Sequence, residues 1–251
     1  LRIVPLRLRE RFEVSSGAWQ DRKIFLVTLH DGDRVGWGEC VAAEDPSYSY
    51  ETTETAWHLI RDFLAPCVVG REFEGPGAVA AAMEGVRGHP MARAAIEMAA
   101  WDLHALKRGV PLVEAIGSEA RPIECGVSIG LQKDVPTLLE KVSGYVEAGY
   151  RRIKMKIKPG RDLELLGAVR ESFPDLPILA DANSAYTLAD LPTLRAMDDL
   201  DLMMIEQPLH WADVLEHAQL QERIETPICL DESIASPRDA ELALELGACR
   251  I

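Results

Sequence analysis

The second half of the chain alternates short apolar runs with longer amphipathic segments, and the alternation has a constant step. Apolar runs end at Lys156, Asp181, Glu206 and Asp231, each 25 residues after the one before. Short apolar runs bounded by turn signals are typical of buried parallel strands. The intervening segments are long enough for one helix and two loops, so the repeat predicts consecutive βα units.

Residues 121–251 are predicted to hold five complete βα units and the start of a sixth. The first strand is expected at 123–130, and the sixth begins at Cys249. The helices are expected at 134–149, 161–173, 187–199, 211–225 and 236–247. Right-handed units of this length close an eight-stranded TIM-type (β/α) barrel, which takes about 250 residues. We therefore expect a barrel domain that is truncated after the start of its sixth strand, and a chain that continues beyond Ile251.

The N-terminal segment predicts an antiparallel sheet. Apolar residues alternate over 2–12, and the runs 23–29 and 34–41 meet across an Asp-Gly turn, which favours a hairpin. Residues 13–22 are polar around a single aromatic side chain, Trp19. We interpret them as a surface loop or, alternatively, as a lid that closes over a ligand.

Helical spacing of apolar residues follows this sheet. One helix is expected over 50–64, ending before Pro66, and a longer one over 89–107, ending at Gly109. Residues 1–120 are therefore predicted to form an α+β domain that precedes the barrel.

Composition narrows the class of protein. The formal net charge is −14 and the pI is about 4.9, which argues against a nucleic-acid partner, because such a partner needs a basic face. The five cysteines are far apart and form no Cys-x-x-Cys pair, as is typical of a reducing cytoplasm. No apolar run approaches the roughly 18 residues of a membrane span, and no signal peptide is visible. We expect a cytoplasmic protein without a membrane partner, with homo-oligomerisation left open.

Three carboxylates are expected to converge, because the C-terminal ends of parallel strands meet at one edge of a sheet. Asp181, Glu206 and Asp231 would offer hard oxygen ligands, which suit Mg²⁺, or alternatively Mn²⁺, better than zinc. A single carboxylate at a strand end is more often a helix cap or one half of an ion pair. Three at equal spacing favour a metal site.

Three polar residues lie one or two positions beyond a predicted ligand: Asn183, Gln207 and Glu232. Partners of metal ligands are commonly found at such positions, where they orient the ligands. We expect these side chains to support the carboxylates rather than bind the metal.

Lys154 and Lys156 are two residues apart on a strand and therefore share a face. Two neighbouring ammonium groups repel each other, so their pKa values are expected to fall from about 10.4 toward the range of a general base. Lys158 lies past the strand and is expected to face solvent.

The segments that carry these groups resemble the enolase superfamily. They are Lys154-Met-Lys156, Asp181-Ala-Asn183, Ile205-Glu-Gln-Pro-Leu209 and Leu230-Asp-Glu-Ser233. Within the superfamily they resemble the muconate-cycloisomerase-like subgroup, and most of all its o-succinylbenzoate synthases and N-acylamino acid racemases. The resemblance implies a capping domain over 1–120 followed by the barrel over 121–251.

The resemblance also implies roles. Lys156 would remove a proton α to a carboxylate, with Lys154 as its electrostatic neighbour. Mg²⁺ on the three carboxylates would stabilise the resulting enediolate. Ser128 and its neighbours would contact a small carboxylate substrate, and the loop around Trp19 would close over it.

The expected reaction is the dehydration that forms o-succinylbenzoate in menaquinone biosynthesis. The alternatives are N-acylamino acid racemisation, cycloisomerisation, dipeptide epimerisation, or a catalytically inactive homologue that only binds a metal. The resembling families carry a second catalytic lysine at the end of the sixth strand. The 25-residue step predicts it near position 256, beyond Ile251.

Overall fold

The computed structural model describes residues 1–15 and 17–251. It divides into two compact units, Leu1–Glu10 with Trp19–Pro122 and Arg11–Ala18 with Ile123–Ile251. The boundary between Pro122 and Ile123 lies two residues after the one expected from the sequence. The segment Arg11–Ala18, which the sequence assigned to the first domain, belongs instead to the second unit. There the carbonyl of Glu13 accepts a backbone hydrogen bond from Leu131 at 2.8 Å.

A three-stranded sheet of order β1-β2-β3 opens the chain, with β1 at Arg2–Val14, β2 at Gly17–Asp31 and β3 at Arg34–Cys40. The predicted hairpin is confirmed: β2 and β3 are antiparallel, and Asp31 pairs with Arg34. Gly32 takes the left-handed backbone angle (φ 58°) that a tight turn between strands requires.

The loop predicted over 13–22 is wrong. β1 continues to Val14 and β2 begins at Gly17, so Trp19 lies on a strand and not in a loop. Hydrogen bonds between neighbouring strands join backbone groups, so a polar run can be a strand whenever a partner strand is beside it. Residue 16 of this segment lies outside the described residues.

The helix predicted to end before Pro66 continues past it. The segment runs through α1 (Thr53–Leu59), the π-helical turn η1 (Ile60–Leu64) and α2 (Ala65–Val68). Within η1 the amide of Ala65 bonds the carbonyl of Ile60, five residues earlier. Pro66 follows in the first turn of α2, where the N–H that proline lacks is not needed. The remaining helices of this unit are α3 (Pro76–Ala82), α4 (Pro90–Arg108) and α5 (Leu112–Ala115).

Strand β3 packs directly against α4 because two of its residues have no side chain. A Cβ atom at Gly38 would lie 2.0 Å from the carbonyl oxygen of Ala95, and one at Gly36 would lie 2.2 Å from that of Ala99. Helix α4 presents alanines at this contact, so strand and helix backbones approach closely.

The buried carboxylate of Glu51 has a structural explanation. It accepts hydrogen bonds from the amides of Met91 (2.8 Å) and Ala92 (3.0 Å), in the first turn of α4. The first amides of a helix have no partner within it, and the positive end of the helix dipole favours a carboxylate there. Glu51 is thus a helix cap and carries no implication of catalysis.

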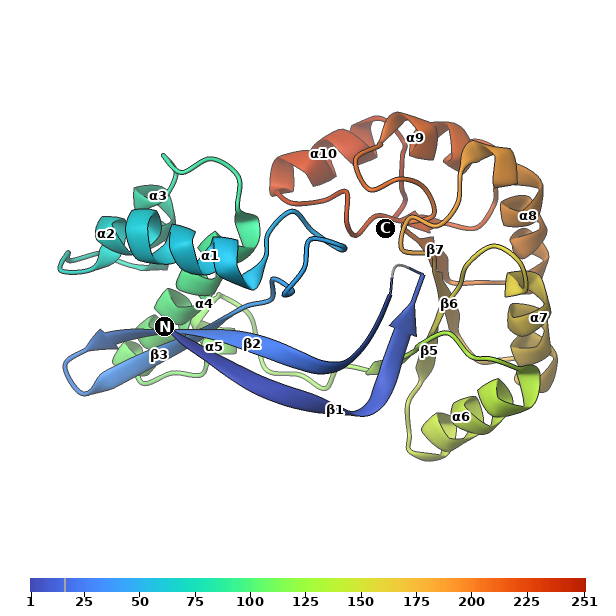
Figure 1. Cartoon of the computed structure of the whole chain (residues 1–251), viewed down its shortest axis with the longest axis horizontal. Coiled ribbons are helices and arrows are strands. Elements are labelled where there is room, and N and C mark those ends of the chain that lie inside the picture. The colour runs from blue at the N-terminus through green and yellow to red at the C-terminus, as the bar shows by residue number, and fades with distance from the viewer. Residues whose placement is uncertain (16) are drawn as a thin grey trace. The chain divides into compact units, whose positions relative to one another are not determined.

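The second unit is a parallel sheet of order β4-β5-β6-β7-β8, whose helices α6 to α10 follow one another along its outer side (Figure 1). The strands are β4 (Gly126–Ile129), β5 (Arg152–Lys156), β6 (Ile178–Asp181), β7 (Met204–Glu206) and β8 (Ile228–Cys229). The helical segments are α6 (Val135–Glu147), α7 (Asp162–Ser172), η2 (Leu188–Asp190), α8 (Leu191–Ala196), η3 (Met197–Leu200), α9 (Leu215–Gln221) and α10 (Pro237–Glu245). Each βα unit predicted from the 25-residue step is present.

The core of this unit lies between the sheet and its helices. Ile153, Ile178, Ile205 and Ile228 have no exposed surface and come from four successive strands. Strands buried on both faces carry near-continuous apolar runs, which is why the pattern could be recognised in the sequence. Among the described helices, none is long and apolar enough to cross a membrane.

Candidate active site

The registers of the parallel strands place three charged residues in one row. Lys156 pairs with Asp181, and Asp181 pairs with Glu206. Each of the three is the last residue of its strand, β5, β6 or β7. Lys154 lies two residues earlier on β5 and therefore on the same face. The C-terminal edge is where active sites of (β/α) barrels are built.

The side chains of this row are in direct contact. The Lys154 Nζ atom lies 2.5 Å from Glu206 Oε1 and 2.8 Å from Asp181 Oδ2. The Lys156 Nζ atom lies 2.5 Å from the same Asp181 oxygen and donates a second hydrogen bond, 2.7 Å long, to Asn183 Oδ1. The Lys156 side chain is 9% exposed and that of Asp181 is fully buried, so water screens these charges little.

The two carboxylates differ in acidity. Burial raises the pKa of Glu206 to about 7, and the nearby charge of Asp181 adds to this effect, despite the hydrogen bond from Lys154. Burial also opposes ionisation of Asp181, but the charge of Lys156 and the hydrogen bonds from both lysines hold its pKa below the ordinary value. Two adjacent carboxylates behave in this way when one takes most of the stabilising contacts.

The pKa of Lys154 moves in the direction opposite to that expected from two neighbouring ammonium groups. Burial alone would lower it, but hydrogen bonds to Asp181 and Glu206, together with their charges, raise the pKa of Lys154 above its ordinary value. The carboxylates at the ends of the next two strands therefore determine the direction of this pKa shift, and not the neighbouring lysine.

Asp231 does not join this group. In the register between β7 and β8, the residue opposite Glu206 is Cys229, so Asp231 lies two residues past the row. β8 ends at Cys229, not at Asp231 as the constant 25-residue step implied, and Asp231 is exposed. Within residues 1–15 and 17–251, no three His, Cys, Asp or Glu side chains are grouped closely enough to hold a metal ion.

The donor chemistry of the row nevertheless fits a hard divalent cation. A single cationic atom, Lys154 Nζ, already contacts one oxygen of Asp181 and one of Glu206. The carboxylates therefore lie close enough to share one positive charge, and oxygen donors without imidazole or thiolate are those that Mg²⁺ prefers.

Two of the three expected supporting residues form a chain behind Lys156. Asn183 accepts from Lys156 through Oδ1 and donates from Nδ2 to Glu232 Oε1 at 2.9 Å. Burial raises the pKa of Glu232. Its other oxygen, Oε2, is buried and has no hydrogen-bond partner among the described residues. The structure therefore connects Glu232 to the lysine through Asn183.

Gln207, the third supporting residue, has a left-handed backbone conformation, which residues other than glycine rarely adopt. Its φ is 37°, and Asn183 (φ 43°) and Ser184 (φ 62°) on the neighbouring loop are also left-handed. Residues other than glycine adopt such angles at a cost of about 1–3 kcal/mol each, and they are found most often at functional sites. Three of them at two adjacent strand ends show that the surrounding contacts, not local preference, determine these loops.

Ser128 lies beside the lysines, whereas Trp19 belongs to the other unit. Ser128 pairs with Lys154 across β4 and β5, and its hydroxyl is buried without a hydrogen-bond partner among the described residues. Ser128, Lys154, Lys156 and Glu206 line a cavity of about 450 Å³. A buried hydroxyl without a partner, next to a cavity, is consistent with a contact to a ligand.

Two buried contacts near the row gave no signal in the sequence. The hydroxyl of Tyr186 donates a hydrogen bond to the carboxylate of Asp162, and both residues are buried. The fully buried His217 accepts the amide of Leu209 at 3.1 Å, and its Nδ1 atom lies 2.7 Å from the carbonyl oxygen of Asp213. The bonds from Tyr186 to Asp162 and from Leu209 to His217 join separate segments of the chain, so no local pattern could have identified them; only His217 and Asp213 have helical spacing, four residues apart.

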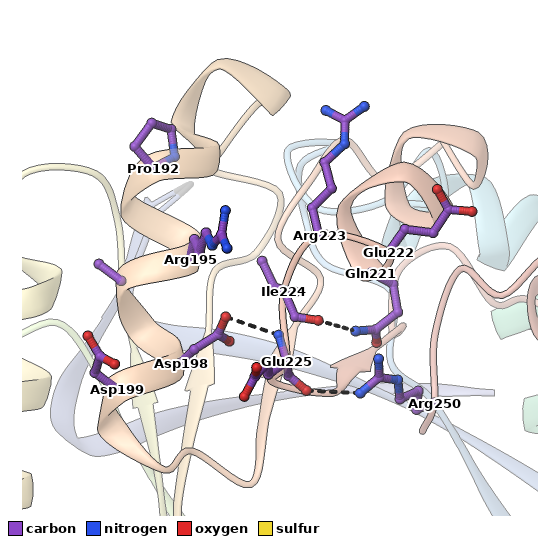
Figure 2. A pocket seen from close by; sticks show the side chains of 11 residues that line it. Pro192, Arg195, Asp198, Asp199, Gln221, Glu222, Arg223, Ile224, Glu225 and Arg250 are labelled. Atoms are coloured by element: carbon purple, nitrogen blue, oxygen red, sulfur yellow. Dashed lines mark hydrogen bonds between the residues drawn. The ribbon is translucent and has the colours of Figure 1, made fainter.

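A larger cavity, of about 790 Å³, opens at the opposite edge of the sheet (Figure 2). Two of its polar side chains bond loop backbone: Asp198 accepts the amides of Glu225 and Thr226, and Arg250 donates to the carbonyl of Glu225. Polar groups at the N-terminal edge of barrel strands usually serve stability. We therefore assign the chemistry to the smaller cavity, which contains the lysines and a carboxylate.

The fold and this row of charges define a class of protein, and comparison with known families agrees. Residues 2–117 match the mandelate racemase / muconate lactonizing enzyme N-terminal domain, and residues 137–251 match the enolase C-terminal domain-like family. The chain belongs to the enolase superfamily. The resemblance inferred from the motifs is confirmed, as is the fold class of a capping domain followed by a barrel-like domain.

Individual relatives are also similar over the whole chain. An o-succinylbenzoate synthase from Geobacillus kaustophilus is 49% identical over 252 residues, which cover 100% of this chain and 67% of that protein. An N-succinylamino acid racemase from Thermus thermophilus is 47% identical and covers 100% of this chain and 68% of that protein. The crystal structure of an unknown enolase-superfamily member from Enterococcus faecalis superposes with a TM-score of 0.91 at 44% identity, covering 99% of this chain and 68% of the other.

Proposed function

We propose that this protein is an o-succinylbenzoate synthase. It would remove the proton α to the carboxylate of a cyclohexadiene substrate and expel the β-hydroxyl as water, the dehydration that serves menaquinone biosynthesis. The observation that carries the proposal is the position of Lys156 at the C-terminal edge, where its Nζ contacts Asp181 and Asn183. Four relatives that are 44–49% identical bear this name.

In this proposal Lys156 accepts the α-proton and then delivers a proton to the leaving hydroxyl on the same face. Asn183 orients the Lys156 amine through its Oδ1 atom. Lys154, whose ammonium is stabilised by Asp181 and Glu206, keeps its proton and supplies a fixed positive charge beside the reacting carboxylate. Ser128 would donate a hydrogen bond to the substrate, and Trp19 remains a proposed substrate contact.

The proposed cofactor is Mg²⁺, with Mn²⁺ as an alternative. Asp181, Glu206 and Asp231 would hold it, and Asn183, Gln207 and Glu232 would support those ligands. When bound, the cation would supply positive charge to the substrate carboxylate as negative charge accumulates there. Such help is needed because a proton α to a carboxylate is too weakly acidic for a lysine to remove alone.

The direct test is loss of the cyclohexadiene's ultraviolet absorbance on adding the purified protein with Mg²⁺. Lys156→Ala should lower the rate by about 10²–10⁴-fold, the usual contribution of a general base, while Mg²⁺ still binds in a calorimetric titration. Lys158→Ala, at an exposed position of the same segment, is the matched control and should change the rate by less than about 2-fold. An unchanged absorbance with the wild-type protein would refute the proposal.

N-succinylamino acid racemisation is the second candidate, because a relative with that name is 47% identical to this chain. It begins with the same proton removal but returns a proton instead of expelling a hydroxyl. The two activities separate in D₂O: a racemase incorporates deuterium at the α-carbon of N-succinyl amino acids, whereas a pure dehydratase leaves these compounds unlabelled. Incorporation without loss of the cyclohexadiene would favour the racemase.

A further inference from the structure

Gln207, the residue after Glu206, makes three side-chain hydrogen bonds to the segment that follows β8. Its carboxamide oxygen accepts the amides of Asp231 (3.0 Å) and Ser233 (3.2 Å), and its Nε2 donates to Ser233 Oγ at 2.7 Å. The residue has no exposed surface. We call these contacts the Gln207 network.

The backbone of Gln207 extends the network in both directions along the sheet. Its amide donates to the carbonyl of Cys229 at 2.9 Å, and its carbonyl accepts the amide of Ser184 at 2.8 Å. Ser184 lies in the loop after β6, Gln207 follows β7, and Cys229 ends β8. One residue therefore connects the ends of three consecutive strands, which accounts for its left-handed backbone.

The backbone amide of Asp231 is held by this network and not by the sheet. β8 has only two residues, Ile228 and Cys229, and the pairing with β7 ends at Cys229. The Asp231 amide, two residues further on, is bonded to Gln207 Oε1 and not to a strand. Without Gln207 the segment from Leu230 to Ser233 would lose the partner of its Asp231 and Ser233 amides and keep side-chain contacts, from Glu232 to Asn183 and from Ser233 to the Trp211 carbonyl.

We propose that Gln207 is the positioning residue for Asp231, holding its backbone so that the Asp231 carboxylate can complete the donor set begun by Asp181 and Glu206. This inference rests on the proposed metal-dependent function. A carboxamide suits the role because it accepts two amides and donates to Ser233 at the same time, which neither a carboxylate nor an apolar side chain can do. It also adds no charge to the site.

Gln221, which bonds the first residue of β8, provides a matched control. Gln221 is also buried, accepts the amide of Ile228 at 2.7 Å and donates to the carbonyl of Thr226 at 3.2 Å. Gln207 thus holds the segment that follows β8, and Gln221 the residues that begin it. Replacing either by methionine removes a buried carboxamide of similar size, but only one of them holds Asp231.

The test compares Gln207→Met with Gln221→Met in two measurements. Calorimetric titration with MgCl₂ should show binding weakened about 10- to 100-fold in Gln207→Met, as for other residues that orient metal ligands, and less than about 3-fold in Gln221→Met. Hydrogen–deuterium exchange without metal should show faster exchange over 230–234 in Gln207→Met alone. Equal effects of the two variants on MgCl₂ binding, or unchanged exchange over 230–234, would overturn the proposal.

The exchange measurement separates this proposal from the proposed function. If the wild-type protein bound no Mg²⁺, the metal-dependent function would fail, and with it the role of Gln207 toward a donor set, even if exchange over 230–234 responded. If wild-type binding were normal and exchange did not respond, only the Gln207 role would fail. Should Gln207→Met not fold, Ser233→Ala removes the Nε2 contact together with the hydrogen bond from Ser233 Oγ to the Trp211 carbonyl, and it leaves both amide contacts to Gln207 Oε1 in place. It should then weaken MgCl₂ binding in the same direction by a smaller factor, and no change would count against the proposal.

Discussion

The hydroxyl of Tyr186 donates a hydrogen bond to the carboxylate of Asp162, and neither side chain is open to solvent. Asp162 begins α7, after the loop that follows Lys156, and Tyr186 lies in the loop that follows Asp181. The pair therefore joins the loops after β5 and β6, the two strands that end in Lys156 and Asp181.

Tyr186→Phe should destabilise the protein by about 1–3 kcal/mol, because the buried Asp162 Oδ2 atom loses its hydrogen-bond donor while Oδ1 keeps only the Leu163 amide. Urea unfolding measures the change. Tyr150→Phe is the control: the Tyr150 ring packs on Tyr145, and loss of its hydroxyl should cost less than about 0.5 kcal/mol. Equal losses in the two variants would show that the Asp162 contact contributes nothing.

Lys154→Met should destabilise the metal-free protein by about 3 kcal/mol at neutral pH, because Glu206 loses the ammonium that it contacts, Asp181 keeps only that of Lys156, and less positive charge offsets the repulsion between the two carboxylates. A cation between the carboxylates should offset that repulsion. The increase in melting temperature on adding MgCl₂ should therefore be larger for Lys154→Met than for the wild type. Lys158→Met serves as the control, and a smaller increase in Lys154→Met would contradict the assignment of a cation to these carboxylates.

His217 should make the stability of the protein depend on pH. Burial lowers its pKa, although its contacts with Asp213 act in the opposite direction. The unfolded state then binds more protons than the folded state, so the contribution of His217 is complete above the unfolded pKa of about 6.5 and is lost as pH falls through that value toward the folded pKa.

His217→Gln removes this titration and can still accept the Leu209 amide. The slope of unfolding free energy against pH is measured by urea unfolding between about pH 5 and 7.5. It should be smaller in the variant, because the proton that His217 takes up on unfolding no longer contributes to it. Parallel curves for wild type and His217→Gln would refute the prediction.

Gly38→Ala should destabilise the first unit by about 1–3 kcal/mol or more, as overpacking does. The added Cβ would lie 2.0 Å from the Ala95 carbonyl oxygen, and neither backbone can move without disturbing the contact between β3 and α4. Gly85→Ala, where the Cβ would meet no atom within 4 Å, is the control. Differential scanning calorimetry should show a lower melting temperature in the first variant only.

Much of the second unit follows from the sequence alone. Lys156, Asp181 and Glu206 form one row because each ends a short strand, and the C-terminal ends of parallel strands meet at one edge of the sheet. The hairpin between β2 and β3 was equally predictable, because an Asp-Gly turn determines its own backbone.

Contacts between distant segments decided the rest. The constant 25-residue step placed Asp231 in the row, but the register from Glu206 to Cys229 moves it two residues beyond, and register is a property of two strands together. The polarity of residues 13–22 predicted a loop, yet pairing between strands made most of that segment β-structure. The Gln207 network and the bond between Tyr186 and Asp162 join separate loops, so no local pattern encodes them. The sequence determined which charged groups follow the apolar runs, because periodicity is local, and the tertiary structure decided where the strands end and which of these groups meet.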